Sequence, residues 1–191
     1  MTSAAPSAVG AEAVQVEELF RHHADFVARF LGRLGAGADE IDDLVQEVFL
    51  TAHRRGGFVP GSAKPTTWLA EIALRVASNA RRSRRRSRVA ADEESVAAAV
   101  SDADGPFESA AHAESTARGQ RALEALDFDR RVVFVLYELE AEPCDAIAAC
   151  LSIPVGTVYS RLHAARREFV RAYQRLSAEP ERHRVEQGGA A

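Results

Sequence analysis

Apolar residues recur every three or four positions along most of this chain, which is the period of an amphipathic helix and not of a strand. The pattern is clearest between Cys144 and Phe169, where Ser152-Ile153-Pro154 interrupts it before it restarts. Its apolar positions are Ile147, Ala148 and Leu151 before the break, and Val158, Leu162, Ala165 and Phe169 after it. The stretch therefore predicts a helix, a tight turn and a second helix.

The second of these helices has a polar face that suits DNA. This face carries Tyr159, Ser160, His163, Arg166 and Arg167. A short helix with such groups fits the major groove, where Arg binds guanine or phosphate and hydroxyls bind phosphate or base edges. An ordinary helical hairpin with a solvated basic face explains the periodicity equally well, so this pattern alone leaves both interpretations open.

Three further helices are predicted in the first half of the chain. Apolar stripes run from Leu19 to Leu31, from Ile41 to Ala52 and from Trp68 to Ala77. The glycine-rich segment Gly32–Gly37 and the breaker-rich loop Arg54–Pro65 separate them. Helices of this kind bury their stripes against each other. With few strand-like runs elsewhere, the fold class is predicted to be all-α.

The helix predicted from the stripe between Ile41 and Ala52 has an acidic outward face. It is made by Asp42, Asp43, Gln46 and Glu47. One interpretation is a solvated face whose acids interact favourably with the helix dipole, and the other is a docking surface for a basic partner.

The third helix ends in a basic run, RRSRRRSR, from Arg81 to Arg88. Such a run is either a solvated helix end or a site for the DNA backbone, with Phe58 in the preceding loop available for stacking on a base.

The character of the chain changes between Val89 and Thr116, which holds alanine, serine and acids but no lysine or arginine. This composition predicts a flexible linker between two domains. We therefore expect five segments: a disordered N-terminus (1–15), a helical domain (16–88), a flexible acidic linker (89–117), a small helical domain with the helix-turn-helix (118–176) and a disordered tail (177–191).

Charge and cysteine content narrow the function. The net charge is −4, with the positive charge concentrated in arginine-rich segments, which predicts modest affinity for free DNA and argues for a larger partner. The two cysteines form no CxxC pair, and neither they nor His22, His23 and His53 have the spacing of a metal site or a nucleophile motif, so we expect no metal, no cofactor and no enzymatic activity.

The start of the chain is unlike a signal peptide and no run reaches membrane-spanning length, which predicts a cytoplasmic protein.

Three blocks together resemble the extracytoplasmic-function (ECF) sigma factors, small promoter-recognition subunits of bacterial RNA polymerase. The blocks are DDLVQEVFLTAHR (42–54), TTWLAEIALRVASNARRSRRR (66–86) and IPVGTVYSRLHAARREF (153–169). Their order and spacing match the second and fourth conserved sigma regions. The resemblance implies that the domain 16–88 is region 2 and the domain 118–176 is region 4.

The resemblance also implies a role for each polar surface. Asp42, Asp43, Gln46 and Glu47 match the patch that docks on the clamp helices of the largest polymerase subunit. The residues expected to melt and hold the −10 element are Phe58, Ser62, Lys64, Trp68, Arg75, Asn79 and Arg82. The residues expected at the −35 element are Thr157, Tyr159, Ser160, Arg161, His163, Arg166 and Arg167, with the arginines on phosphates.

The resemblance thus implies a sigma factor that binds core RNA polymerase and directs promoter-specific initiation. Its partners would be core polymerase, through the clamp helices and the β-subunit flap, promoter DNA and an anti-sigma protein. The alternative is a stand-alone helix-turn-helix regulator that binds duplex DNA without polymerase, which the acidic net charge disfavours.

Overall fold

The computed structural model describes residues 13–61, 64–90 and 110–188, and it describes no side chains at 88–90, at 110–112 or from 179 onward. Within these ranges the chain is helical, and its only extended pairing is an isolated bridge between Val14 and Phe58. The predicted all-α class is therefore confirmed.

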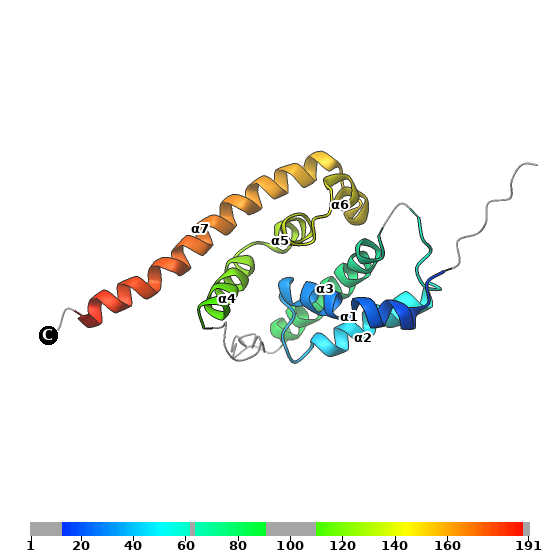
Figure 1. Cartoon of the computed structure of the whole chain (residues 1–191), viewed down its shortest axis with the longest axis horizontal. Helices are drawn as coiled ribbons and strands as arrows, with labels where there is room; N and C mark the ends of the chain where they lie inside the picture. The colour runs from blue at the N-terminus through cyan, green and yellow to red at the C-terminus, as the bar shows by residue number, and fades with distance from the viewer. Residues whose placement is uncertain (1–12, 62–63, 91–109, 189–191) are drawn as a thin grey trace, which may run out of the picture.

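The N-terminal half is a bundle of α1 (Val16–Arg33), α2 (Ile41–Arg54) and α3 (Pro65–Ala90), which all pack against each other (Figure 1). Each helix contributes its apolar stripe to a shared interior. The most completely buried side chains of this half are Leu19, Val27, Phe30, Leu31, Val48, Leu69 and Ile72. Burying a side chain of this size stabilises the fold by about 1.5–3 kcal/mol relative to exposure, so these stripes hold the bundle together.

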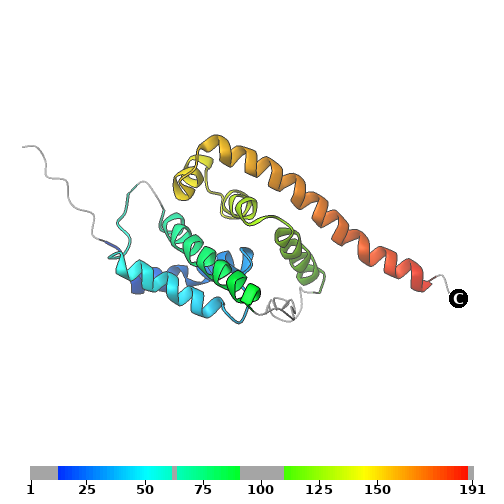
Figure 2. The same cartoon turned by 180° about the vertical axis from the view of Figure 1, so that it is seen from behind.

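The C-terminal half contains α4 (Ala110–Glu124), α5 (Phe128–Phe134), the π-helical turn η1 (Val135–Leu139), α6 (Cys144–Leu151) and α7 (Val155–Gly188). The long α7 runs along α4, α5 and α6, as both views show (Figures 1 and 2). Val133, Leu136, Ile147 and Val158 are almost completely buried between these helices. The predicted helix, turn and helix between Cys144 and Phe169 are therefore present as α6, its turn and the first part of α7.

The structure shows order beyond both ends of the predicted folded region. Residues 1–15 were predicted to be disordered, but Val14 N–H donates to the Phe58 carbonyl at 2.7 Å, and the Val14 carbonyl accepts from Phe58 N–H at 3.1 Å. The tail 177–191 was also predicted to be disordered, but α7 continues to Gly188. That segment lacks an apolar period, yet its alanine, glutamate and arginine residues favour helix. Residues 1–12 and 189–191 lie outside the described part.

Helices also enter both ends of the predicted linker 89–117. α3 continues to Ala90, and α4 begins at Ala110, inside the segment that was predicted to be flexible. The alanine-rich sequence of this segment favours helix, and α4 gains further stability by packing on α7. The centre of the predicted linker, residues 91–109, lies outside the described residues.

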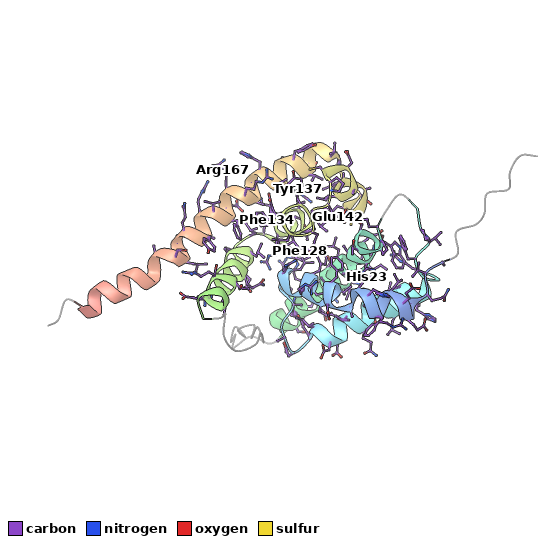
Figure 3. The ribbon with its side chains drawn as sticks, viewed as in Figure 1. His23, Phe128, Phe134, Tyr137, Glu142 and Arg167 are labelled. Carbon is purple, nitrogen blue, oxygen red and sulfur yellow. The ribbon has the colours of Figure 1, made fainter. Side chains whose placement is uncertain are left out.

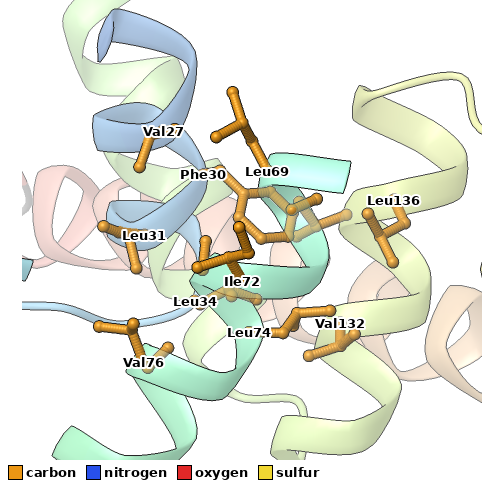
Figure 4. Close-up of a cluster of buried hydrophobic side chains, with 14 of the residues drawn as sticks. Val27, Phe30, Leu31, Leu34, Leu69, Ile72, Leu74, Val76, Val132 and Leu136 are labelled. Atoms are coloured by element: carbon orange, nitrogen blue, oxygen red, sulfur yellow. The ribbon is translucent and has the colours of Figure 1, made fainter. Parts of the chain in front are cut away.

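The two halves pack against each other through one continuous core. Leu74 of α3 lies beside Val132 of α5, and Leu136 of η1 lies near the same side of α3 (Figure 4). A guanidinium also bridges the halves: Arg131 donates to the Leu34 carbonyl of the N-terminal half at 3.2 Å and to the Glu124 and Leu126 carbonyls of its own half at 2.8 and 3.1 Å. Burial lowers the pKa of Arg131 below its ordinary value.

Candidate functional site

The acidic face of α2 is fully presented to solvent. Asp42, Asp43, Gln46 and Glu47 are all exposed, because Val45, Val48 and Phe49 turn the opposite face of the helix into the core. Glu47 is paired with Arg54 across one side of the face at 3.3 Å. The predicted cluster is therefore one continuous surface on a rigid helix.

An apolar groove of about 580 Å³ borders this acidic face, between α1 and α2. Its exposed apolar side chains include Phe20, which is 49% exposed, and Leu50, which is 43% exposed. Asp42 and Gln46 form part of the same groove. Sequence reasoning placed Phe20 in an inward stripe and did not single out Leu50, because periodicity does not show which edge of a stripe stays uncovered. An exposed apolar groove rimmed by acids is suited to a basic amphipathic partner.

The exposed side of α3 carries a second polar surface. Arg75, Asn79 and Arg82 are exposed on it, and Arg82 donates to the Asn79 side-chain oxygen at 3.0 Å. Arg75 pairs with Glu71 at 3.2 Å. These three predicted residues lie together, and Arg75 and Asn79 line a groove of about 590 Å³ between α2 and α3.

The loop before α3 differs from expectation. Phe58 was predicted to offer its ring for stacking, but it is only 5% exposed and packs on Trp68 with 5.7 Å between ring centroids. The backbone pairing with Val14 holds it inward. The neighbouring Val59, which sequence reasoning did not single out, is 61% exposed. Lys64 is exposed and Trp68 is half-buried, whereas Ser62 lies outside the described residues.

The turn between α6 and α7 is held by backbone geometry. Ser152 ends α6 in the left-handed conformation with φ of 54°, and its N–H bonds to the Ala149 carbonyl at 3.2 Å. Ile153 N–H bonds back to the Ala148 carbonyl, and Pro154 then precedes the first residue of α7. This arrangement closes α6 and fixes the direction in which α7 leaves it.

The first turns of α7 present the predicted polar face. Tyr159 is 59% exposed, and Ser160, His163, Arg166 and Arg167 are exposed beside it, while Thr157 is half-buried. Figure 3 shows Arg167 on the outer side of α7. Neighbouring Cys144, desolvation and Asp145 raise the pKa of Tyr159. A tyrosine hydroxyl both donates and accepts hydrogen bonds.

Two arginines of this face are held in position by acids of the same half. Arg161 donates to Asp129 at 2.7 Å, and Arg166 donates to Glu138 at 2.6 Å with its guanidinium 5.1 Å from the centre of the Tyr137 ring. The hydrogen bond to Glu138 raises the pKa of Arg166. Each cation is therefore pre-oriented beside the helix, and part of its charge is already neutralised.

Neither a metal-binding group nor a membrane-spanning helix is found among the described residues. Among them, no group of three or more His, Cys, Asp or Glu side chains could hold a metal ion. His22 Nδ1 is 2.9 Å from the Glu18 carbonyl, and burial lowers the pKa of His23. In the same part of the chain, none of the helices has the length and apolar character needed to cross a membrane.

Two models of known protein families match this chain. The family model described as Sigma-70 region 2 matches residues 19–87, and the model described as Sigma-70, region 4 matches residues 120–169. The first match contains α2 and nearly all of α3, and the second contains the helix-turn-helix. The chain belongs to the ECF sigma factor family.

Individual relatives agree with this membership. The ECF RNA polymerase sigma factor SigE of Mycolicibacterium smegmatis is 31% identical over 154 residues, which are 80% of this chain and 59% of that relative. The ECF RNA polymerase sigma-E factor of Escherichia coli K12 is 30% identical over 147 residues, or 73% of this chain and 76% of the relative. The RNA polymerase sigma-H factor of Pseudomonas aeruginosa is 32% identical, covering 74% of this chain and 77% of the relative.

Solved structures share the fold. The sigma factor RpoE, crystallised with the anti-sigma factor NepR from Bartonella quintana, has a TM-score of 0.71 at 19% identity, over 83% of this chain and 96% of that one. CnrH in complex with the cytosolic domain of CnrY has a TM-score of 0.56 at 23% identity, over 81% and 84% of the two chains. This sigma factor thus shares its helical architecture with both solved structures.

Proposed function

We propose that this sigma factor binds core RNA polymerase through the acidic face of α2 and confers promoter choice through two DNA-reading surfaces. The observation that carries the proposal is the separation of the three polar surfaces on rigid helices. Asp42–Glu47 lies on α2, Arg75–Arg82 on α3 and Tyr159–Arg167 on α7. The proposed role is that of a non-enzymatic initiation factor.

Polymerase docking is assigned to the acidic face together with its groove. The exposed carboxylates steer a basic partner, and the rings and side chains of Phe20, Phe49 and Leu50 supply apolar contact area. The clamp helices of the largest polymerase subunit are the expected partner. The β-subunit flap would bind the C-terminal half.

DNA opening is assigned to α3 and the loop before it. Unstacking a base step costs a few kcal/mol, which a melting surface must offset with backbone contacts and a place for the extruded base. Arg75 and Arg82 supply charge, Asn79 supplies donors and acceptors, and Lys64 and Trp68 stand where the loop enters α3. Exposed Val59 is a further candidate for apolar contact with an unstacked base.

Duplex reading is assigned to the first turns of α7. Tyr159, Ser160 and His163 would contact base edges of the −35 element, and Arg161, Arg166 and Arg167 would contact phosphates. Because Asp129 and Glu138 hold the first two arginines, their guanidiniums need little reorganisation on binding.

Regulation by an anti-sigma protein is expected for this chain. Support comes from two of the similar solved structures, which are complexes with an anti-sigma factor and with the cytosolic domain of CnrY. The acidic face of α2 and the polar face at the start of α7 are the two surfaces on which we expect such a partner to bind.

The docking assignment is tested by reversing charge on α2. The double variant Asp43→Lys, Glu47→Lys should bind core polymerase about tenfold or more weakly, because two attractive charges become repulsive at the interface. Binding is measured by fluorescence anisotropy of the labelled chain at several salt concentrations. Glu114→Lys, an exposed site on α4, is the matched control. Unchanged core binding in the double variant would remove the assignment.

The reading assignment is tested on the face of α7. Substituting Tyr159, Ser160 and His163 by alanine should change the preferred −35 sequence and weaken the original promoter by a factor of roughly 5–150 for each lost base contact. Transcription from a promoter library with core polymerase measures the preference, and Gln174→Ala, exposed farther along α7, is the control. Tight, sequence-specific binding of duplex DNA by the free chain would instead favour a stand-alone regulator.

A further inference from the structure

The connection between η1 and α6 makes two side-chain bonds to the other half of the molecule. Glu140 accepts from the guanidinium of Arg33, at the end of α1, at 2.5 Å. Glu142 accepts from the hydroxyl of Thr67, in the first turn of α3, at 2.7 Å. Two successive glutamates flanking one residue thus bind the two helices α1 and α3 of the N-terminal half.

The residue between the two glutamates has a strained backbone. Ala141 adopts φ of 52°, which is unfavourable for a residue with a Cβ atom. This conformation occurs immediately after the π-helical turn, and Glu142 N–H bonds back to the Leu136 carbonyl at 2.9 Å. The segment is therefore shaped at a local cost into a conformation in which both glutamates bond to the N-terminal half.

Glu142 is an unusual carboxyl group for this chain because it is only 5% exposed. It lies where α6 faces the start of α3 (Figure 3), and its hydrogen bond to Thr67 is the one side-chain partner the described residues give it. A buried carboxyl group is costly unless a donor satisfies it. The hydrogen bond from Thr67 offsets the cost of burying the Glu142 carboxyl group in the closed form. When the halves separate, water hydrates this carboxyl group instead.

This contact also covers the beginning of α3. A groove of about 360 Å³ between the halves is lined by Lys64, Thr67, Trp68 and Glu71 on one side and by residues of the 142–150 segment on the other. Lys64 and Trp68 are residues to which the proposed function gives contact with opened DNA. In the closed molecule the 142–150 segment faces Trp68, which is half-buried, while Lys64 stays exposed at the edge of the groove.

The closed arrangement conflicts with simultaneous reading of two promoter elements. Positions 25 base pairs apart on B-DNA are separated by roughly 85 Å, at about 3.4 Å for each base pair. In this structure the start of α3 touches α6, which leads directly into the reading helix α7. The halves must therefore separate before one chain can contact both elements.

We propose that Glu140–Ala141–Glu142 is a latch that holds the two halves of the free chain together and covers Thr67 and one side of Trp68, at the start of α3, until the halves separate. The part of the proposal that concerns DNA rests on the proposed function, whereas the closure itself does not. The other polar bridges between the halves among the described residues, from Arg131 to the Leu34 carbonyl and from Gln120 to the Gly32 carbonyl, hold the end of α1 and do not cover the start of α3.

The test weakens the latch without changing the charges around the reporter group. The double variant Glu140→Ala, Thr67→Val removes one partner from each bond and leaves Glu142 without its donor in the closed form. Glu168→Gln is the matched control, because Glu168 pairs with Arg130 inside the C-terminal half. Circular dichroism checks that each variant keeps its helices. Ala141→Gly, which relieves the strained φ, is a second variant and should close the halves more firmly.

Cys150 reports the opening. It lines the groove between the halves, and a Cys144→Ala background makes it the single thiol. The double variant loses the hydrogen bonds from Arg33 to Glu140 and from Thr67 to Glu142. The fraction of molecules with separated halves should therefore rise about tenfold or more, and the alkylation rate of Cys150 at neutral pH should rise by the same factor. The radius of gyration from small-angle X-ray scattering should increase, and Ala141→Gly should slow alkylation.

DNA binding is measured on the same proteins with a fluorescein-labelled single-stranded oligonucleotide of mixed sequence. The free double variant should bind it about tenfold more tightly than the parent chain. Unchanged alkylation and scattering in the folded double variant would overturn the latch. Faster alkylation with equal oligonucleotide affinity would overturn the covering of Thr67 and Trp68. Failure of all these proteins to start transcription with core polymerase would count against the proposed function, and the alkylation result would still decide the latch.

Discussion

At the scale of single residues, surroundings decide the role more than residue type does. Glu47 lies on α2, where it is exposed and pairs with Arg54. Glu142 lies just before α6, where it is buried and bonds to Thr67. Arg82 is exposed and bonds to Asn79 on its own helix, whereas Arg131 is half-buried and its Nε atom has no hydrogen-bond partner in the described structure. A periodic pattern gives the face of a residue and not what lies opposite it.

Cys150 supplies a prediction at this scale. Burial, with the negative charges of Glu71 and Glu142, raises the pKa of its thiol from 9.0 to about 11. The unfolded thiol ionises at the ordinary value, so the associated stability is present below pH 9 and is lost as the pH rises toward 11. We expect the free energy of unfolding to fall by roughly 1–3 kcal/mol more in the parent chain than in Cys150→Ala over this window.

Urea unfolding at both ends of that pH window measures the effect. Comparison with Cys150→Ala removes the contributions of other groups that titrate there, because they are common to the two proteins. Equal losses in the parent and the variant would show that the thiol is not protected by its surroundings.

At the scale of elements, the sequence predicted the helices well and their ends poorly. The apolar stripes around Val27, Val48 and Leu162 placed α1, α2 and α7 correctly, because one buried face in each is enough to set the period. Cys144–Leu151 and the break at Ser152 were also predicted. Helix ends depend on packing between elements, which explains why α4 begins within the predicted linker.

Parts of the candidate site escaped prediction for the same reason. The exposure of α2's acids followed from the stripe opposite them, and so did that of Arg75 and Asn79 on α3. The burial of Phe58 depends on its pairing with Val14, a residue in a segment that has no apolar period. No local signal in the sequence indicates a bridge formed between segments so far apart.

The length of α7 leads to a prediction about this element. Beyond the region 4 match, Ala172 is buried and Tyr173 stacks on Phe169 at 6.1 Å, with its hydroxyl 3.3 Å from Ser115 of α4. A chain that stops after Phe169 should therefore lose roughly 3 kcal/mol or more of unfolding free energy, because the support of α4 is removed. Urea denaturation followed by circular dichroism measures the loss.

A chain that stops after Ala178 is the control for that truncation, since it keeps Ala172 and Tyr173. Tyr173→Phe separates the ring from the hydroxyl and should cost only about 0.5–1.5 kcal/mol, the value of one hydrogen bond. If the chain that stops after Phe169 and the chain that stops after Ala178 have the same free energy of unfolding, α4 does not depend on this part of α7.

At the scale of the whole molecule, the halves are joined by a core as well as by the acidic linker. Buried residues of α1 and α3 are continuous with those of α5 and η1 in one cluster. Arg81 of α3 also lies over the Phe128 ring of α5, 4.4 Å from its centre. The two family matches are therefore separate along the sequence but share an interior in the free chain.

We expect this shared interior to make thermal unfolding a single transition. Calorimetry of the parent chain should give one peak, because loss of either half exposes apolar surface of the other. The variant Leu74→Ala, Val132→Ala, which trims the contact between α3 and α5, should broaden the peak or split it in two. Two separated peaks in the parent chain would mean that the halves unfold independently.

The covered start of α3 has a thermodynamic consequence for assembly. A ligand that binds at Thr67 and Trp68 replaces their contact with the C-terminal half, so its binding shifts the closed–open equilibrium toward separated halves. By linkage, a partner that holds the halves apart raises the affinity of that ligand for Thr67 and Trp68 by the same factor. Such reciprocity needs no signal passing through the linker. Opened DNA and polymerase would each strengthen the hold of the other on this chain, and a partner that favours the closed form would weaken both.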